Sequence, residues 1–253
     1  MISEAEAIAE LESGVRQAGR KLLELWPAAA SECSALGVRS KPDGSLVSRA
    51  DMESNQILVE LISRLFPDDA ILSEESPLIG ASERVWIIDP LDGTKSFLNG
   101  LDDFSILVAL CEDGAPRLGM MFFPARGLFV KAIRGGAATV NGELIKVSGA
   151  SELLQGRVYI RNFECKRPEL ASPMMDSGLA LLKVANGELD GAIIRMSTHR
   201  EWDIAAPMAV LLSAGGAVSD ETGAQIRLGK NGLECAYFIA SNGRIHKQLQ
   251  GLI

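Results

Sequence analysis

The segment that most constrains this chain is short: an apolar run turns sharply at two aspartates. Residues 86–97 read Trp-Ile-Ile-Asp-Pro-Leu-Asp-Gly-Thr-Lys-Ser-Phe. The proline fixes φ near ~−65° and removes an amide donor, the glycine permits a tight bend, and the threonine can begin a helix. The pattern therefore predicts a strand, a turn and the start of a helix, with Asp89 and Asp92 at the turn.

This turn has the groups that a cation and a phosphate require. Carboxylates and a backbone carbonyl suit Mg²⁺, and the first N–H groups of a helix suit an anion. For Asp92 and Gly93 alone, an ordinary Asp-Gly turn is the simpler interpretation. Asp89, Thr94 and the flanking apolar run favour the ligand-binding interpretation.

Acids also stand at the edges of two other apolar segments. Glu74 and Glu75 follow the run Ala-Ile-Leu-Ser of residues 70–73, and Asp203 lies in the otherwise apolar stretch 202–206. A carboxylate in such a stretch has no obvious structural need, which favours Asp203 as a ligand. Metal sites are usually assembled from separate segments, so we expect the three acidic segments to converge.

The three acidic segments, in this order, resemble the signature of the inositol monophosphatase superfamily, whose members are Mg²⁺-dependent, Li⁺-sensitive phosphatases. The resemblance covers nearly the whole chain, because residues 135–148 and 214–216 are similar to the family's connecting segments. It implies an α/β fold, namely a layered αβαβα sandwich with the site between its halves. It also implies an enzyme, a phosphoric monoester hydrolase that acts on a small phosphate ester.

The resemblance further implies two Mg²⁺ ions and assigns their ligands. Glu74, Asp89 and the Leu91 carbonyl would bind the first ion, which carries the attacking water. Asp89, Asp92 and Asp203 would bind the second ion, which stabilises the departing oxygen. Paired ions of this kind relieve both the charge repulsion and the poor leaving group that make phosphate monoesters inert.

The phosphate and the attacking water are assigned, also by resemblance, to the same turn. The amides of Gly93 and Thr94 would bind phosphate oxygens, and the Thr94 hydroxyl with Asp51 would orient and deprotonate the water. The match for Asp51 is the segment 48–51, Ser-Arg-Ala-Asp. The alternative for Asp51 is an N-cap of the helix that it opens, worth about 1 kcal/mol. The two roles could coexist.

Three residues near these segments are left without an assigned role. Glu75 either supports Glu74 or is simply solvated, and Lys41 is either a surface loop residue or an electrostatic contact near the first ion. His199, four residues before Asp203, either lines the pocket or lies in a surface loop. The chain has only two histidines, which argues against a histidine nucleophile or a His-rich metal site.

The substrate is predicted from departures from the family pattern. Inositol-specific members have an acid seven positions before the last metal aspartate, where this chain has Met196, so we expect inositol phosphate to be a poor substrate. Lys95 and Glu201 are more similar to the branch with 3'(2'),5'-bisphosphate nucleotidase activity, which is our first prediction. The alternatives are an inositol-1-monophosphatase, a histidinol-phosphatase and, from another class, a catalytically inactive phosphate-binding regulatory protein.

Composition restricts the remaining partners. The chain has 25 basic and 33 acidic residues, a net charge of −8, which argues against a nucleic-acid polymer or an anionic membrane. Four dispersed cysteines argue against a zinc site or a disulfide framework, and we expect them to be reduced and mostly buried. The start of the chain lacks a basic and apolar leader, and no run reaches the ~18 apolar residues of a membrane span. We expect a cytoplasmic homodimer.

The hydrophobic pattern places a soft boundary near Ser148. Before it, we predict amphipathic helices over about residues 8–25 and 51–65, a mobile turn at 41–45, and strands at 70–72, 85–88, 104–110, 118–123 and 129–133. After it, strands and helices alternate, with elements at 157–161, 180–184, 191–194 and 237–240 and helices at 174–175 and 203–214. The predicted domains are an N-terminal half, 1–148, with most metal ligands, and a C-terminal half, 149–253, with Asp203 and the substrate pocket.

Overall fold

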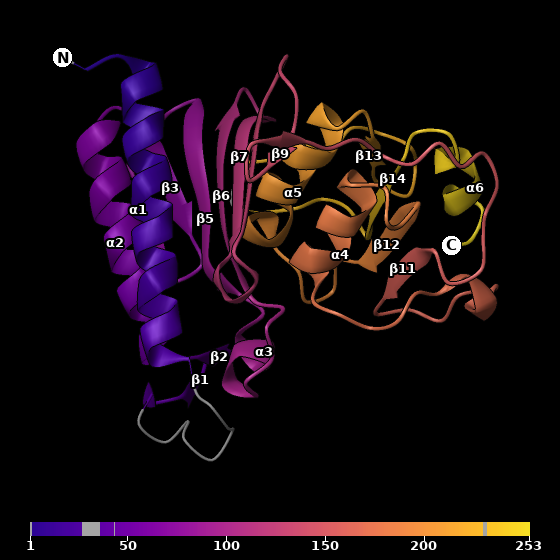
Figure 1. Ribbon diagram of the computed structural model, residues 1–253, viewed down its shortest axis with the longest axis horizontal. Coiled ribbons are helices and arrows are strands. Elements are labelled where there is room, and N and C mark those ends of the chain that lie inside the picture. Colours follow the sequence, from indigo (N-terminus) through magenta and orange to yellow (C-terminus); the bar gives the residue numbers. More distant parts are fainter. Residues whose placement is uncertain (1, 27–35, 43, 230–231) are drawn as a thin grey trace.

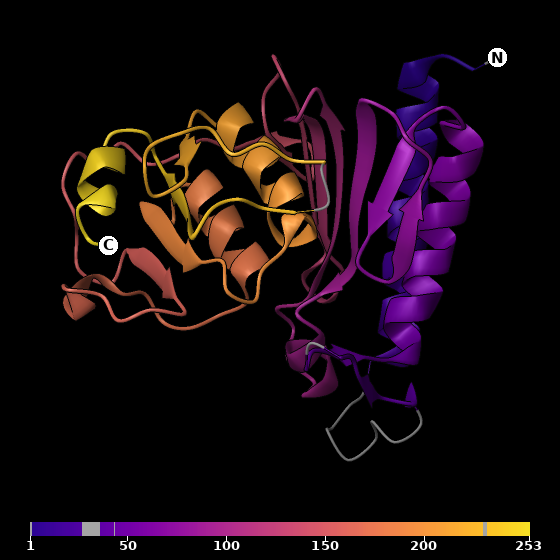
Figure 2. The ribbon, with the colours of Figure 1, turned by 180° about the vertical axis from the view of Figure 1, so that it is seen from behind.

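The computed structural model describes residues 2–26, 36–42, 44–229 and 232–253, to which the statements below are confined. The chain forms five layers, in the order helix, sheet, helix, sheet, helix (Figures 1 and 2). This is the αβαβα arrangement that the resemblance implies. From one outer layer to the other, the helices are α1 (Glu4–Leu25), α2 (Arg49–Leu65), α4 (Ser177–Ala185), α5 (Glu201–Ser213) and α6 (His246–Gln250).

The first sheet has eight strands in the order β10-β9-β8-β7-β6-β5-β3-β4. Its neighbours are antiparallel except for β3 and β5, which run parallel. Its central strands are buried almost throughout because helices cover both faces, which explains their continuous apolar runs. The strands are β3 (Ala70–Ser73), β4 (Ser76–Ile79), β5 (Arg84–Asp92), β6 (Ser105–Glu112), β7 (Ala115–Phe123), β8 (Leu128–Ile133), β9 (Thr139–Val140) and β10 (Glu143–Leu144).

The second sheet has four strands in the order β11-β12-β14-β13. A crossover through α4 makes β11 and β12 parallel, so their carboxyl ends lie at one edge of the sheet. The strands are β11 (Val158–Arg161), β12 (Gly191–Arg195), β13 (Ala217–Ser219) and β14 (Tyr237–Ser241). Four shorter pieces complete the fold: the hairpin of β1 (Arg39–Ser40) and β2 (Leu46–Val47), the helix α3 (Thr94–Leu98), and the 3₁₀ turns Pro124–Arg126 and Pro168–Leu170.

Both long N-terminal helices begin with a capping box. At α1, the Ser3 amide donates to the Glu6 carboxylate at 2.7 Å while Ser3 Oγ accepts from the Glu6 amide. At α2, the Ser48 amide donates to Asp51 Oδ2 at 2.7 Å. The N-cap of α2 is therefore Ser48, and the alternative of Asp51 as N-cap is wrong, because Asp51 lies in the first turn and caps the helix from there.

Most of the predicted elements are confirmed within a few residues, including the two N-terminal helices and the five strands of the first half. The helix predicted at 174–175 is wrong. Helix α4 begins at Ser177, because Asp176 is its N-cap and accepts from the Gly178 amide at 3.0 Å. The hairpin of β1 and β2 was not predicted, since two-residue strands leave no hydrophobic period to detect.

Three further predictions concern the cysteines, the turn at 41–45 and the division near Ser148. Among the described cysteines only Cys111 is buried, because Cys165 and Cys235 are partly exposed, and Cys33 lies outside the described residues. The turn at 41–45 lies between β1 and β2, with residue 43 outside the described set. The division near Ser148 stays a prediction, although the first sheet ends before it and the second begins after it.

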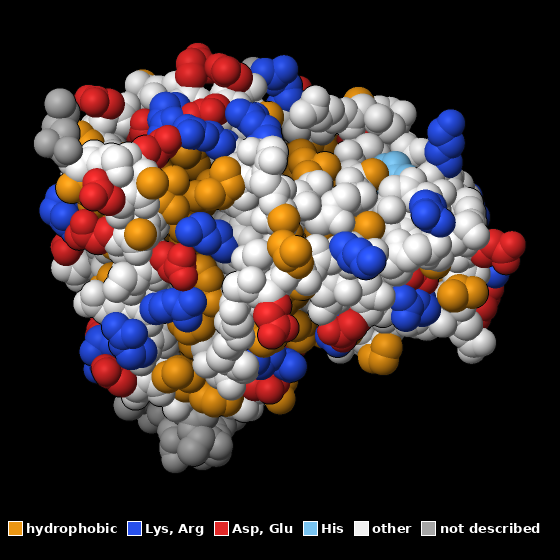
Figure 3. Space-filling model, turned by 45° about the horizontal axis from the view of Figure 1, so that its top comes forward, with side chains coloured by type: hydrophobic (Ala, Val, Ile, Leu, Met, Phe, Trp, Pro, Cys, Tyr) orange, Lys and Arg blue, Asp and Glu red, His pale blue; other side chains and the backbone are white. Residues whose placement is uncertain are grey.

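The surface shows charges of both signs. On the face in Figure 3, acidic and basic side chains are interspersed, and hydrophobic side chains form a band among them. No described helix is long and apolar enough to cross a membrane. The predictions of a cytoplasmic location and a homodimer stay predictions.

Helix α5 lies close against the first sheet because strand β7 has a glycine at the contact. A Cβ at Gly119 would lie 2.7 Å from the carbonyl oxygen of Ala206 and 2.7 Å from the Cβ of Ala209, both in α5. Small side chains on both elements therefore set the distance at which α5, with Asp203 in its first turn, lies over the sheet.

We predict that Gly119→Val lowers the free energy of unfolding by ~1 to 3 kcal/mol, because the added atoms would overpack this contact. Gly149→Val is the matched control, since a Cβ at Gly149 has no atom within 4 Å. Chemical unfolding of both variants measures the effect. Equal stability of the two variants would contradict this account of the interface.

Candidate functional site

Strand β5 ends in a bulge that turns the side chains of Asp89 and Asp92 toward the same side. Asp89 pairs with Leu107 and Asp92 with Ser105, so two residues of β5 lie opposite one residue of β6. Pro90, inside the bulge, has no N–H to donate to the ladder, and its carbonyl accepts instead from Ser54 Oγ at 2.7 Å. The bulge replaces regular alternation, in which Asp89 and Asp92 would point to opposite faces.

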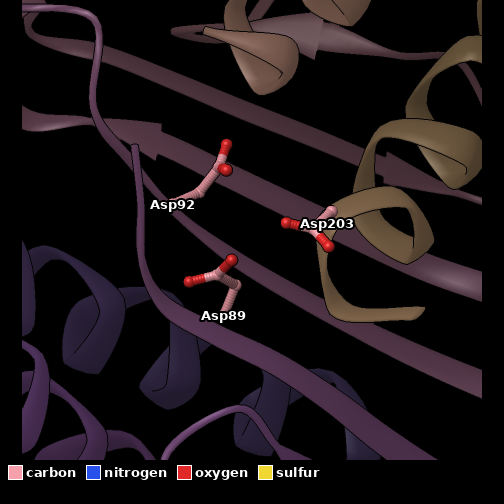
Figure 4. Close-up of side chains that lie close together, drawn as sticks. All are labelled: Asp89, Asp92 and Asp203. Atoms are coloured by element: carbon pink, nitrogen blue, oxygen red, sulfur yellow. The ribbon is translucent and has the colours of Figure 1, made fainter. Parts of the chain in front are cut away.

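Asp203 reaches the same space from the first turn of α5. The carboxyl groups of Asp89, Asp92 and Asp203 can each place an oxygen within 4.8 Å of the others. Figure 4 shows the three side chains facing one another, two from the strand and one from the helix. Asp203 is held there by the Arg200 amide, which donates to its Oδ2. The predicted convergence is therefore seen for two of the three acidic segments, the one with Asp89 and Asp92 and the one with Asp203.

The three aspartates repel one another in a buried setting. Burial raises the pKa of Asp89 well above its ordinary value, and the charges of Glu74, Asp92 and Asp203 raise it further. Burial likewise raises the pKa of Asp92, and it raises that of Asp203 to about 7. None of the three has a lysine or arginine ion-pair partner within the described part of the chain. A cluster of hard oxygen ligands without a counter-charge fits Mg²⁺.

Glu74 lies beside this cluster and contacts a lysine from the N-terminal hairpin. Lys41 Nζ is 2.7 Å from Glu74 Oε1 and 2.6 Å from Glu75 Oε1. Burial alone would lower the pKa of Lys41, but its two carboxylate partners raise it overall. Burial raises the pKa of Glu75 to about 7. Lys41 is thus a charged contact of Glu74 and not a free surface residue, and Glu75 is not simply solvated.

The side chains of Asp51 and Thr94 also meet at the turn. Thr94 Oγ1 is 3.2 Å from Asp51 Oδ1 and 3.1 Å from the Leu91 carbonyl oxygen, either of which can accept its hydrogen. The other oxygen of Asp51 accepts from the Ser48 amide and hydroxyl, so Asp51 is both a helix cap and a neighbour of Thr94. The Leu91 amide donates to Asp89 Oδ1 at 3.0 Å, which fixes that carboxylate against the turn.

Gly93 adopts a left-handed conformation, with φ of 82°, at the start of α3. A Cβ at this position would lie 3.2 Å from the Asp176 carboxyl group and 3.3 Å from the Phe104 Cα, so only glycine fits easily. The first amides of α3 have no acceptor within the helix. Gly93 and Thr94 therefore have the geometry that the sequence predicts for binding an anion.

Asp176 is a site residue that sequence reasoning missed. Its carboxyl group shares a hydrogen bond with Asp92. Burial raises the pKa of Asp92, and the charge and the hydrogen bond of Asp176 raise it further. The backbone of α4 also lies close to Asp92, since a Cβ at Gly178 would be 2.3 Å from Asp92 Oδ2. An acid before a Ser-Gly pair at a helix start was the available signal, but it is too common to assign a role.

A cavity of about 630 Å³ opens over these acids. His199 lines it, is buried and contacts Ser177 Oγ at 3.3 Å, which excludes the surface-loop alternative. Met196 does not line this cavity and belongs to the hydrophobic core, where it faces a separate space of about 300 Å³. Glu201 is also buried and does not line this cavity. Its carboxylate accepts a hydrogen bond from the Gly232 amide at 2.7 Å. The substrate arguments drawn from Met196 and Glu201 therefore lose their basis.

Comparison with known proteins identifies this arrangement. The inositol monophosphatase family matches residues 5–253. The chain belongs to the inositol monophosphatase family. As a member, it has the enzyme class of phosphoric monoester hydrolases, and it has a cluster of three acids that could hold a metal ion.

Individual relatives of this family are similar over most of their length. A fructose-1,6-bisphosphatase/inositol-1-monophosphatase of Thermotoga maritima is 34% identical over 219 residues, 81% of this chain and 80% of that protein. A histidinol-phosphatase of Chlorobaculum parvum is 33% identical, over 80% of this chain and 83% of that protein. A solved Thermotoga maritima IMPase superposes with a TM-score of 0.84 at 28% identity, covering 97% and 96% of the two chains. The fold is therefore the sandwich of this family.

We predict that Mg²⁺ stabilises the folded protein, and more so at high pH. Because burial raises the pKa values of Asp89, Asp92 and Asp203, the folded state binds more protons than the unfolded state between about pH 4 and 7. Without metal, stability should therefore fall as the pH rises through this range. Mg²⁺ requires the deprotonated acids, so its stabilising effect should grow over the same range.

Thermal unfolding with Mg²⁺ or with a chelator measures this effect. At a hundred times Kd, Mg²⁺ should raise Tm by roughly 5 to 10 °C at about pH 8 and by much less at about pH 5. The Asp89→Asn variant should lose most of the gain. A gain of equal size at both pH values, or the same gain in Asp89→Asn, would contradict the prediction.

Proposed function

We propose that this protein is a Mg²⁺-dependent phosphatase that hydrolyses a small phosphate monoester with water. The observation that supports the proposal most is the convergence of Asp89, Asp92 and Asp203 beneath a cavity, without a lysine or arginine ion-pair partner for any of the three in the described part of the chain. Glu74 and the Leu91 carbonyl would complete the ligands. When bound, Mg²⁺ acts as a Lewis acid that lowers the pKa of water and offsets charge on the phosphate.

The residues of the chain supply orientation and proton transfer. In this proposal, the amides of Gly93 and Thr94 bind phosphate oxygens at the start of α3. The Thr94 hydroxyl orients the attacking water, and Asp51 Oδ1, beside it, accepts the proton. Burial raises the pKa of Asp51, which makes its carboxylate a better base than an exposed aspartate.

For the substrate, the names of the relatives favour our alternatives over our first prediction. Those named for an activity are a fructose-1,6-bisphosphatase/inositol-1-monophosphatase, a histidinol-phosphatase and an inositol-1-monophosphatase, and others are named Nus factor SuhB; none of these names is that of a 3'(2'),5'-bisphosphate nucleotidase. Since Met196 does not line the cavity, the argument against inositol phosphate that rested on this residue no longer holds. We therefore propose a phosphorylated polyol or sugar as the substrate class. A purified-protein screen of these esters with Mg²⁺ tests it.

Asp92→Asn should lower kcat at least a hundredfold, because it removes one anionic metal ligand while Ser105 can still hydrogen-bond to the side chain. Asp68→Asn, at an exposed aspartate that does not line the cavity, is the matched control and should keep its activity. Phosphate release under saturating Mg²⁺ measures both. Near-normal turnover in a folded Asp92→Asn variant would overturn the assignment of this acid.

Li⁺ should inhibit hydrolysis, since the family resemblance implies that it displaces Mg²⁺ from the site of Asp89, Asp92 and Asp203. The measurement is a Li⁺ titration of initial rates at limiting Mg²⁺, with K⁺ at the same ionic strength as control. Inhibition should weaken as Mg²⁺ is raised. Rates that stay constant across the titration would show that this ion site differs from the proposal.

A further inference from the structure

Glu201 is a buried acid that the proposed mechanism does not use. It lies in the first turn of α5, two residues before Asp203, and is 2% exposed. It has no lysine or arginine ion-pair partner within the described part of the chain. A buried carboxylate is costly unless its oxygens accept hydrogen bonds. Since Glu201 does not line the catalytic cavity, the hydrogen bonds that it accepts indicate its role.

Both carboxylate oxygens of Glu201 accept from the connection between β13 and β14. Its Oε2 accepts from the Gly229 amide, and its Oε1 accepts from the Gly232 amide at 2.7 Å. This connection follows α5 in the chain and returns to the start of that helix. The two hydrogen bonds therefore join the first turn of α5 to the connection at two points.

The same connection is fixed to the first sheet. The Leu228 amide donates to the carbonyl oxygen of Gly114, in the turn between β6 and β7, at 3.0 Å, and the Leu228 side chain is buried. Gly229 has φ of 85° and packs on Val85, because a Cβ at Gly229 would lie 3.3 Å from Val85 Cγ2. Val85 belongs to β5, the strand whose terminal bulge carries two of the three clustered acids.

These contacts form a continuous link between the two elements that supply the acids. Asp203 comes from α5 and faces the two acids of β5 (Figure 4). Gly229 contacts both elements, α5 through the Glu201 carboxylate and β5 through Val85. Ligands of a metal site must be held within about 0.5 Å of the productive geometry by the groups around them. The link through Gly229 can supply this restraint.

We propose that Glu201 is a positioning residue, which holds Asp203 where it can bind the same Mg²⁺ ion as Asp89 and Asp92. It does so by hydrogen-bonding α5 to the connection that packs on β5. Glu201 itself lies outside the cavity and contacts neither the ion nor the substrate. This inference rests on the proposed function and adds a residue to the support of the same site.

Mn²⁺ binding to the chelator-treated protein, followed by the electron paramagnetic resonance of free Mn²⁺, tests the inference. Glu201→Gln keeps the shape of the side chain but puts an NH₂ group against one of the two amides, so one hydrogen bond is lost. For the Mn²⁺ ion whose binding Asp203→Asn removes, Glu201→Gln should raise Kd about tenfold or more. At saturating Mg²⁺, its kcat should return to near the wild-type value.

The chain offers a matched control for this substitution. Glu221 also accepts from two backbone amides, those of Ala236 and Tyr237, at 3.1 and 3.0 Å. Glu221→Gln should leave the Kd of Mn²⁺ unchanged. When Asp203 is already asparagine, Glu201→Gln should not alter the remaining Mn²⁺ binding, because the two residues act on the same ion.

Gly229→Ala tests the other end of the link. Its added Cβ meets Val85 and strains a left-handed backbone, so this variant should also raise the Kd of Mn²⁺. Gly127→Ala is its control, because Gly127 has φ of 63° but no atom within 4 Å of an added Cβ. If Glu201→Gln does not fold, the Kd of Gly229→Ala relative to this control decides.

A folded Glu201→Gln variant with a lower Tm but the wild-type Kd for Mn²⁺ would overturn the inference, since Glu201 would then only stabilise the fold. That result would leave the proposed phosphatase intact. Mn²⁺ binding that Asp203→Asn leaves unchanged would overturn the ligand set of the proposed function, and this inference with it.

Discussion

The mutual repulsion of three clustered aspartates, two of them buried and the third, Asp203, partly buried, is the constraint on which the site depends. Asp89, Asp92 and Asp203 lie close together, and burial makes their ionised forms costly. The fold holds them there through rigid parts: a bulge at the end of a central strand and the first turn of a helix packed on the same sheet. A divalent cation would relieve this cost, and in our proposal the ionised acids of this cluster form the metal site.

The packing around the cluster explains its position. Helix α5 lies close to the first sheet because Gly119 faces Ala206 and Ala209, and α4 reaches Asp92 because Gly178 has no side chain. Each half of the chain therefore contributes an acid to the space between the two sheets. The second half also brings the carboxyl edge of β11 and β12 to that space, and with it Arg161 and Arg200.

The sequence predicted the parts of the site that are encoded locally. Asp89, Pro90, Asp92 and Gly93 lie within one turn, so their spacing alone indicated a turn and a helix start. Asp203 was found because a charge in an apolar stretch has few structural explanations. The layered fold came from the resemblance and from apolar runs that match strands buried on both faces.

The parts that were missed or left open depend on tertiary contacts. Asp176 reaches Asp92 only because α4 packs beneath the turn, and Lys41 reaches Glu74 only through a hairpin of two-residue strands. Met196 was placed in the pocket by counting back from Asp203, but β12 ends just before it and its side chain enters the core. Residue spacing could not predict where the Met196 side chain points, because the loop between β12 and α5 has no regular period.

The most direct test of the central claim is to locate a metal ion. Mn²⁺ takes the same oxygen ligands as Mg²⁺ and scatters X-rays anomalously, so crystals soaked in Mn²⁺ reveal its position. The account predicts an anomalous peak at roughly 2 to 2.5 Å from carboxylate oxygens of Asp89, Asp92 and Asp203. Crystals that show Mn²⁺ only at other residues, or none at these three under saturating metal, would contradict it.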